Sequence, residues 1–315
     1  MTIAQNALID TVTDNDVVIT LSDAGAVTGD VDISKYVLAD GGGTTFTLGS
    51  TGQNVDTGSG ADIINVAGLT ATGRFDTVSA DTIQLSTGAN IASVKGEGDV
   101  AGTGFNANNL TLVKPDGGDG ASVTMTAAQN NSFSSASAAG TTDQITISDA
   151  TDAKGLDGIE TYVLAAGAQT FTLGAAGQSV TANGGGAGAA IVIDTDTQTT
   201  VSGAFSANNG NDTIKLNVET TNTNISTATT TDVDTIDLGT DVNATMSRAQ
   251  NAKIAAADGT NTVTLSDAGD TDGDALVETY VLAAGAQTFT LGSGSQNVTA
   301  DSSGDSGAIV IDTNT

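Results

Sequence analysis

The chain carries one 15-residue segment twice. The sequence ETYVLAAGAQTFTLG runs from Glu160 to Gly174 and again, unchanged, from Glu278 to Gly292. A looser copy, KYVLADGGGTTFTLG, runs from Lys35 to Gly49. An enzyme needs its special residues once, in one pocket, whereas a repeat architecture reuses one building element many times. The repetition therefore favours a fold assembled from similar units.

Two residue types mark the period of the repeat. All the methionines and tyrosines of the chain fall at equivalent positions in its copies: Met1, Met125 and Met246, and Tyr36, Tyr162 and Tyr280. The period is therefore about 120 residues. We expect a first repeat at 1–124, a second at 125–245 and a truncated third at 246–315. Because the sequence stops within the third repeat, we expect a piece of a longer array; a short protein with an incomplete last repeat is the alternative.

Short alternating segments follow one another within each repeat. Each unit opens with a short helical candidate, such as SRAQNAKIAAADG from Ser247, which begins at a capping residue and ends at a glycine. Strands such as NTVTLSD, TYVLA and TFTLG follow at close spacing. With 3% aromatic residues and the single proline Pro115, we predict a mainly β fold: a parallel β-solenoid with one short helix per repeat. Tandem β-sandwich domains are the alternative.

Aspartate dominates the charge of the chain. The net charge is −29, from 33 Asp and 4 Glu against 8 Lys and Arg. Such a field disfavours nucleic acid and anionic membranes as partners and favours cations. A general solvating surface has no reason to exclude glutamate, whereas short aspartates suit tight glycine-rich turns and hard cations. We therefore expect calcium as the cofactor, with simple solvation as the alternative.

The loop before each repeat tyrosine is the first candidate calcium site. Asp23, Asp149 and Asp267 each lie 13 residues before that tyrosine. In the third copy further aspartates alternate around Gly273, a pattern that can turn carboxylates toward one point. The remaining candidates are Asp30 and Asp32 in the first copy, Asp152 and Asp157 in the second, and Asp270, Asp272 and Asp274 in the third. A solvated acidic turn is the alternative for all three loops.

The second candidate is a glycine- and aspartate-rich motif. GSGADII, residues 58–64 with Asp62, fits the pattern G-x-G-x-D-x-U that binds calcium between stacked turns. NNGNDTI, residues 208–214 with Asp212, is a relative in which asparagine replaces the first glycine. The copies are isolated rather than in tandem, so we expect at most one or two sites of this kind.

These elements resemble the repeat regions of large bacterial surface proteins. The GIETYVL element at 158–164, the threonine-rich strands, the absence of cysteine and the scattered G-x-G-x-D-x-I remnants are similar to the RTX-related S-layer and adhesin group. The resemblance implies β-solenoid repeats, secretion to the bacterial cell surface, calcium-dependent folding, and self-association or adhesion. The chain departs from that group because it lacks tandem nonapeptides.

The same features disfavour an enzyme. Histidine and cysteine are absent, which removes zinc sites and Ser-His or Cys-His nucleophile pairs. The eight basic residues share no repeat position at which they could hold an anionic substrate.

We therefore expect a repetitive extracellular structural protein: part of a surface layer, fibre or adhesin stalk that associates with itself, assisted by calcium. The alternative is an adhesin module that recognises carbohydrate or a host surface; cell-surface polysaccharide is a further candidate partner, and membrane insertion is not expected.

Overall fold

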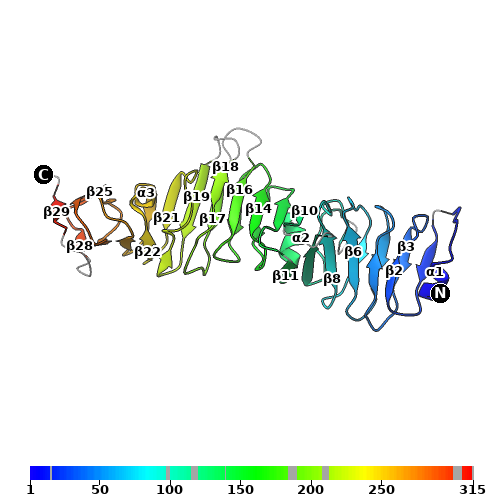
Figure 1. The fold of residues 1–315 in the computed structure, drawn as a ribbon. Coiled ribbons are helices and arrows are strands. Elements are labelled where there is room, and N and C mark those ends of the chain that lie inside the picture. The colour runs from blue at the N-terminus through cyan, green and yellow to red at the C-terminus, as the bar shows by residue number, and fades with distance from the viewer. Residues whose placement is uncertain are drawn as a thin grey trace. The chain divides into compact units, whose positions relative to one another are not determined.

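The computed structural model describes residues 1–14, 16–96, 100–114, 120–138, 140–183, 190–207, 213–300 and 307–313. The chain is a mainly β protein, a parallel β-solenoid of about 14 turns with few short helices (Figure 1). The predicted solenoid is therefore confirmed. Tandem sandwiches do not fit, because sandwich sheets are antiparallel, whereas the paired strands of this chain run parallel.

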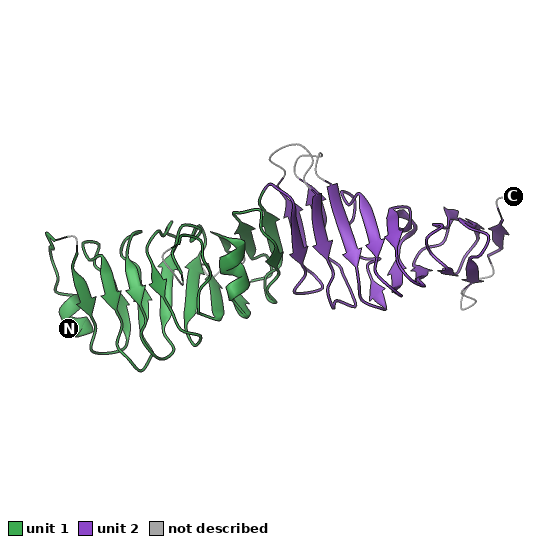
Figure 2. Cartoon of the chain, turned by 180° about the vertical axis from the view of Figure 1, so that it is seen from behind, with its two compact units in different colours: residues 1–165 green, residues 166–315 purple. Residues whose placement is uncertain are grey.

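The solenoid divides into two compact units, residues 1–165 and 166–315 (Figure 2). The division lies inside the second predicted repeat, and the repeat boundaries themselves stay a prediction. Within each unit the coils are stacked, and successive coils contribute neighbouring strands to the same sheet.

Unit 1 contains two long sheets. Sheet A has the spatial order β1 (Val18–Thr20), β3 (Lys35–Val37), β5 (Asn54–Asp56) and β7 (Phe75–Asp76). Sheet B has the spatial order β2 (Ala26–Thr28), β4 (Thr45–Thr47), β6 (Ile63–Ala67), β8 (Thr82–Ser86), β9 (Asn109–Val113) and β11 (Ser135–Ala138). The remaining strands of unit 1 are β10 (Ser122–Met125), β12 (Gln144–Ile147), β13 (Ala153–Lys154) and β14 (Thr161–Leu164).

Unit 2 is built in the same way. One sheet orders β15 (Gln169–Thr172), β17 (Ala190–Asp194), β19 (Thr213–Val218), β21 (Thr235–Leu238) and β23 (Ile254–Ala257). A second orders β20 (Thr223–Asn224), β22 (Asn243–Met246), β24 (Thr262–Leu265), β26 (Thr279–Leu282) and β28 (Asn297–Ala300). Further pairs join β16 (Ser179–Ala182) to β18 (Phe205–Ala207), and β27 (Gln287–Thr290) to both β25 (Thr271–Asp272) and β29 (Ile309–Asp312).

The repeated segment forms two of these strands and turns its aromatic residues inward. In the third copy it spans β26 and β27, whose alternate residues face the interior. Tyr280 and Phe289 are both 0% exposed, and their ring centroids lie 4.8 Å apart. Tyr36 and Phe46 form the same contact in the first copy, at 4.7 Å. The repeated aromatics are thus core residues of a thin interior made otherwise of small aliphatic side chains.

The glycine that ends the segment allows neighbouring coils to approach closely. A Cβ atom on Gly49 would lie 1.8 Å from the carbonyl oxygen of Gly29 in the preceding coil. A Cβ atom on Gly292 would lie 2.1 Å from the carbonyl oxygen of Gly273. No side chain fits at these distances, so glycine is required here by the stacking of the coils.

One short helix opens each copy, as the sequence predicts, but it is shorter than expected. The helices are α1 (Ile3–Asn6), α2 (Ala127–Ser132) and α3 (Arg248–Asn251), and each begins with a reciprocal capping box. In the third copy the helical prediction extends over residues that form β23 instead. The backbone there pairs with β21 of the preceding coil, and Ile254 turns into the core. Pairing between coils therefore overrides local helix propensity.

Buried glutamines bind the turns between consecutive strands, here called corners, of the preceding coil. Gln250 donates from Nε2 to the carbonyl oxygens of Ile225 (2.7 Å) and Ala228 (3.2 Å). Gln129, at the equivalent position of the second copy, donates in the same way to Ile91 and Val94. The carbonyls of Ile91, Val94 and Ile225 also accept a backbone N–H, so the amide adds a second hydrogen bond there and joins the two coils.

Replacing Gln250 with alanine should lower the free energy of unfolding by about 1–3 kcal/mol, because the carbonyl of Ala228 loses the amide donor and that of Ile225 keeps only the N–H of Ala228. Urea unfolding followed by circular dichroism measures the loss. Gln5→Ala is the matched control: Gln5 also closes a capping box, but its side chain is exposed. Equal losses in the two variants would show that the capping box, rather than the corner, carries the effect.

Candidate functional site

The first aspartate of each predicted calcium loop binds the start of the repeat helix. Its Oδ1 accepts the backbone N–H of the first helical residue. The three bonds join Asp23 to Ile3 (2.7 Å), Asp149 to Ala127 (2.8 Å) and Asp267 to Arg248 (2.8 Å). A free N–H group at a helix start needs such an acceptor. The equal spacing of these aspartates therefore reflects a structural bond made in every copy.

The repeat tyrosine orders the same loop from the core side. Its hydroxyl accepts the N–H of the residue six positions earlier, at 2.8 Å in each copy: Asp30, Leu156 and Asp274. In the third copy the hydroxyl of Tyr280 also donates to Oδ1 of Asn251 (2.9 Å). Burial raises the pKa of the tyrosine hydroxyl in all three copies. These hydroxyls therefore remain protonated donors under ordinary conditions.

The carboxylates of Asp30 and Asp274 stabilise the turn in which they lie. Oδ1 of Asp30 accepts the N–H of Asp32 (2.9 Å), and Oδ1 of Asp274 accepts the N–H of Leu276 (2.8 Å). Such bonds to the residue two positions on are typical of turns that begin with aspartate. Asp32 itself is exposed.

The third copy brings all four of its predicted ligands to one surface hollow. Asp267, Asp270, Asp272 and Asp274 line a hollow of about 580 Å³ together with Arg248. The Arg248 guanidinium reaches Oδ2 of Asp267 (3.1 Å, from Nε) and the carbonyl oxygen of Asp270 (3.0 Å, from Nη1). Oδ1 of Asp270 accepts the N–H of Thr288 (2.8 Å). A cation already lies among these acids, and it is the side chain of Arg248.

The first and second copies differ from the third at this point. Ile3 and Ala127 hold the position of Arg248, so no guanidinium enters their loops. In the second copy Asp152 and Asp157 are exposed. Among the described residues, no three or more His, Cys, Asp or Glu side chains gather as a metal ion requires. Calcium binding by the three loops stays a prediction.

Asp62 of the glycine-rich motif lies inside the coil stack. It is 1% exposed, and its Oδ1 accepts the N–H of Thr44 in the preceding coil (2.7 Å). Its own N–H donates to Oδ1 of Asp81 in the next coil (2.9 Å), so buried acids form a ladder from coil to coil. Oδ2 of Asp62 has no hydrogen-bond partner. Burial, with a smaller contribution from the charge of Asp81, raises the pKa of the Asp62 carboxyl.

Unit 2 repeats this ladder with an uncharged residue. Asn261, which is 0% exposed, accepts the N–H of Val242 at Oδ1 (2.8 Å) and donates from Nδ2 to the carbonyl oxygen of Asp258 (2.8 Å). The amide thus makes the bond that the carboxylate makes in unit 1, and it satisfies its second polar atom as well. The other predicted residue of this class, Asp212, lies outside the described residues.

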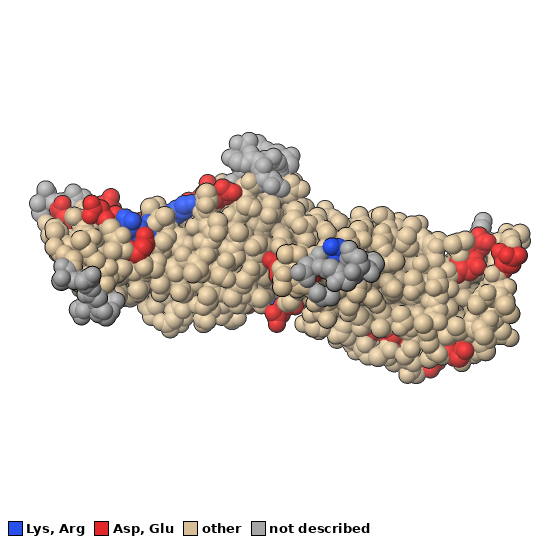
Figure 3. Space-filling model, viewed as in Figure 1, with Lys and Arg blue, Asp and Glu red and all other residues tan. Residues whose placement is uncertain are grey.

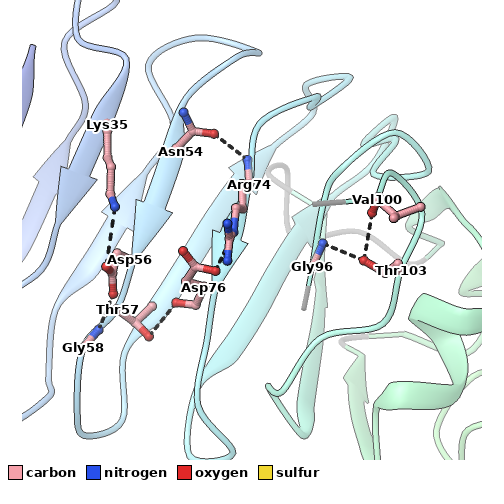
Figure 4. A network of polar contacts seen from close by, with 10 residues as sticks. All are labelled: Lys35, Asn54, Asp56, Thr57, Gly58, Arg74, Asp76, Gly96, Val100 and Thr103. Carbon is pink, nitrogen blue, oxygen red and sulfur yellow. Dashed lines mark hydrogen bonds and ion pairs between the residues drawn. The ribbon is translucent and has the colours of Figure 1, made fainter. Parts of the chain in front are cut away.

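Charged side chains on the outside of sheet A form a ladder of their own (Figure 4). Lys35 on β3 pairs with Asp56 on β5 (3.6 Å), and Arg74 pairs with Asp76 on β7 (2.7 Å). Oδ1 of Asn54 accepts the N–H of Arg74 between them (2.8 Å). Each of the four charged side chains is about one-third exposed. Pairs of this kind contribute at most about 1 kcal/mol to stability, so their main effect is local charge balance.

Sequence reasoning missed the amide residues that bind neighbouring coils. The signal was present, because Gln and Asn follow one another in MTIAQN, MTAAQN and MSRAQN. In each copy the asparagine donates to a carbonyl of the next coil: Asn6 to Thr28, Asn130 to Lys154 and Asn251 to Asp272. Amides that recur with the period of a solenoid indicate bonds between coils.

Replacing Asp149 with alanine should lower the free energy of unfolding by about 0.5–2 kcal/mol, because α2 loses the acceptor at its start. Thermal melts of both the variant and the parent, in calcium and in chelator, measure the loss. Asp157→Ala, at an exposed position, should leave the midpoint nearly unchanged. A loss at Asp149 that vanished in chelator would instead identify that aspartate as a calcium ligand.

Replacing Asp62 with asparagine should preserve or raise stability at neutral pH. The folded chain holds the proton of this carboxyl more tightly than the unfolded chain, so stability falls as pH rises from the ordinary value of 3.8 through the raised folded pKa. The variant should lose that part of the pH dependence when urea unfolding is measured at increasing pH above 3.8. Asp32→Asn, at an exposed position, should retain it. A destabilised Asp62→Asn chain would show that the charge itself is needed.

No helix within the described residues has the length and apolar character needed to cross a bilayer. Comparison of the sequence with protein-family models, and of the chain with curated proteins and with solved structures, finds no match. The site must therefore be interpreted from its own geometry, in which the repeated polar residues bind the backbone of neighbouring coils.

Proposed function

We propose that the protein is a repetitive structural protein of the bacterial cell exterior: part of a surface layer, fibre or adhesin stalk that associates with itself. One observation carries the proposal. Three polar residues recur in every copy: the aspartate at the helix start, the asparagine after the glutamine, and the tyrosine. Each binds the backbone of its own coil or of an adjacent one. Repetition that serves internal bonds maintains a scaffold.

The loop aspartates that differ from copy to copy support the same proposal. A catalytic or ligand site is locally unique, and its groups point into a common space. In the first and second copies the aspartates of the loop divide between backbone acceptors and exposed positions. In the third copy they line one hollow, but the guanidinium of Arg248 lies among them. Such loops tolerate change from copy to copy, as the drift of their acids shows.

The negative net charge of the chain supports a role for calcium in self-association. A chain with a net charge of −29 repels its own copies at low ionic strength, and a divalent cation reduces that repulsion. The exposed aspartates Asp32, Asp152, Asp157 and Asp272 lie where a cation from solution can reach them. Binding at such carboxylates would bridge or neutralise rather than form a closed cage.

The second candidate, a binding module for carbohydrate or a host surface, is favoured by a single feature. The hollow lined by Arg248 and the third-copy aspartates has no counterpart of Arg248 in the other copies. A guanidinium beside carboxylates can contact several hydroxyl groups of a sugar at once. The feature is local, whereas the shared residues extend over the whole repeat, so the structural proposal has the wider support.

Thermal melts and sedimentation velocity, each in excess calcium and in chelator, test the proposal. Calcium at about 100 times its dissociation constant should stabilise the fold by roughly 2.7 kcal/mol, if it binds one site of the folded chain alone. Sedimentation should show species larger than a monomer in calcium. A monomer at every protein concentration, with or without calcium, would contradict self-association and favour the binding module.

A further inference from the structure

The three copies differ at the residue that opens the repeat helix. This residue is Ile3 in the first copy, Ala127 in the second and Arg248 in the third. In every copy its backbone N–H donates to Oδ1 of the loop aspartate, as described above. The copies differ in what lies beside the second carboxylate oxygen, Oδ2. This difference determines how each loop is held.

The second and third copies satisfy Oδ2 of the loop aspartate in different ways. In the second copy Oγ1 of Thr151 donates to Oδ2 of Asp149 (2.8 Å). In the third copy Gly269 takes the position of Thr151, and Nε of Arg248 donates to Oδ2 of Asp267 instead (3.1 Å). A Cβ atom on Gly269 would lie 2.6 Å from Cζ of Arg248, so a side chain there would displace the guanidinium. The glycine therefore makes room for the arginine.

The first copy has the same room but no cation in it. Gly25 corresponds to Gly269, and both glycines have a positive φ, +146° and +138°. Cδ1 of Ile3 would lie 3.3 Å from a Cβ atom on Gly25, so an isoleucine side chain enters the space that the guanidinium enters in the third copy. The two loops have the same length, because the aspartate lies 13 residues before the tyrosine in both. The first copy is thus a form of this loop without the arginine.

The guanidinium of Arg248 joins α3 to the next coil. Besides Asp267 it binds the carbonyl oxygen of Asp270 through Nη1 (3.0 Å), and Oδ1 of Asp270 accepts the N–H of Thr288 one coil further on (2.8 Å). Basic and acidic atoms lie side by side in Figure 3 over the part of unit 2 where Figure 1 labels α3. Carboxylate and carbonyl oxygens are the ligands that calcium takes in proteins. Here a guanidinium, with its fixed set of N–H donors, binds both kinds.

We propose that Arg248 is the internal cation of the third-copy loop: it holds residues 267–274 in place without calcium, and it excludes calcium from the position between Asp267 and Asp270. The inference rests on the proposed function for the role of calcium and deepens it, because it assigns the response to calcium to carboxylates outside this position. A side-chain cation is present at any calcium concentration, whereas a bound ion depends on the concentration in solution. The third-copy loop should therefore be equally ordered in calcium and in chelator.

Hydrogen exchange of residues 267–274, measured by mass spectrometry, tests this inference. Arg248→Ile gives the third copy the residue that the first copy has at this position. In the parent, protection of the loop should be the same in calcium and in chelator. In the variant it should fall several-fold in chelator and rise again in calcium, because the freed oxygens can bind the ion. A parent loop that gains several-fold protection in calcium, or a variant loop that responds no more than the parent loop, overturns the inference.

Two further variants control the experiment. Ile3→Arg adds the cation to the first copy, where Gly25 leaves room for it beside Asp23, and should raise the protection of residues 23–30 in chelator several-fold. Unchanged protection there would contradict the inference even if Arg248→Ile failed to fold. Arg74→Ile removes an Arg–Asp pair of similar exposure that lies on sheet A. It should leave the exchange of residues 267–274 as it is in the parent.

Sedimentation velocity of the parent in calcium separates this inference from the proposed function. A parent that associates, but whose third-copy loop gains protection in calcium, contradicts the role of Arg248 alone. A parent that remains monomeric contradicts the proposed self-association, and the exchange of residues 267–274 still decides whether Arg248 excludes calcium.

Discussion

The fold depends on hydrogen bonds between consecutive coils. Along the strands these bonds form regular parallel ladders, but every corner interrupts the ladder and leaves buried backbone groups to be satisfied. Backbone N–H groups of the same turn bind some of these groups, and side chains from the adjacent coil bind them as well. Gln250 binds two carbonyls of one corner, and Lys253 donates to three of another, those of Thr230, Thr231 and Val233. A solenoid of this kind is stable only if its polar side chains are placed as regularly as its apolar ones.

This constraint explains why so many aspartates of the chain serve its structure. Asp149 caps a helix, Asp274 closes a turn, and Asp62 and Asp81 join three coils through buried bonds. The carboxylate suits these positions because it accepts N–H groups at short range. The cost of burying it appears at Asp62, whose pKa is raised by burial. Asn261 makes the same bond without that cost.

Charge then divides the surface of unit 1 into two kinds. Sheet A carries paired acids and bases, whereas sheet B presents hydroxyl and amide groups without charge. The paired charges of sheet A offset one another, whereas the hydroxyl and amide groups of sheet B interact with water without adding to the net charge of −29.

The sequence by itself determined the architecture. The repeat of Tyr162 and Tyr280 predicts the period, and the alternation of apolar residues and the capping residues predict the short strands and the helix starts, because these depend on neighbours in the chain. Only the tertiary structure decided what each aspartate does. Asp62 is buried and Asp32 is exposed although both lie in similar acidic, glycine-rich surroundings, because stacking decides which side of the backbone faces the next coil. For the same reason, the strand that replaces the end of the predicted third helix and the uncharged face of sheet B became visible only once the coils were in register.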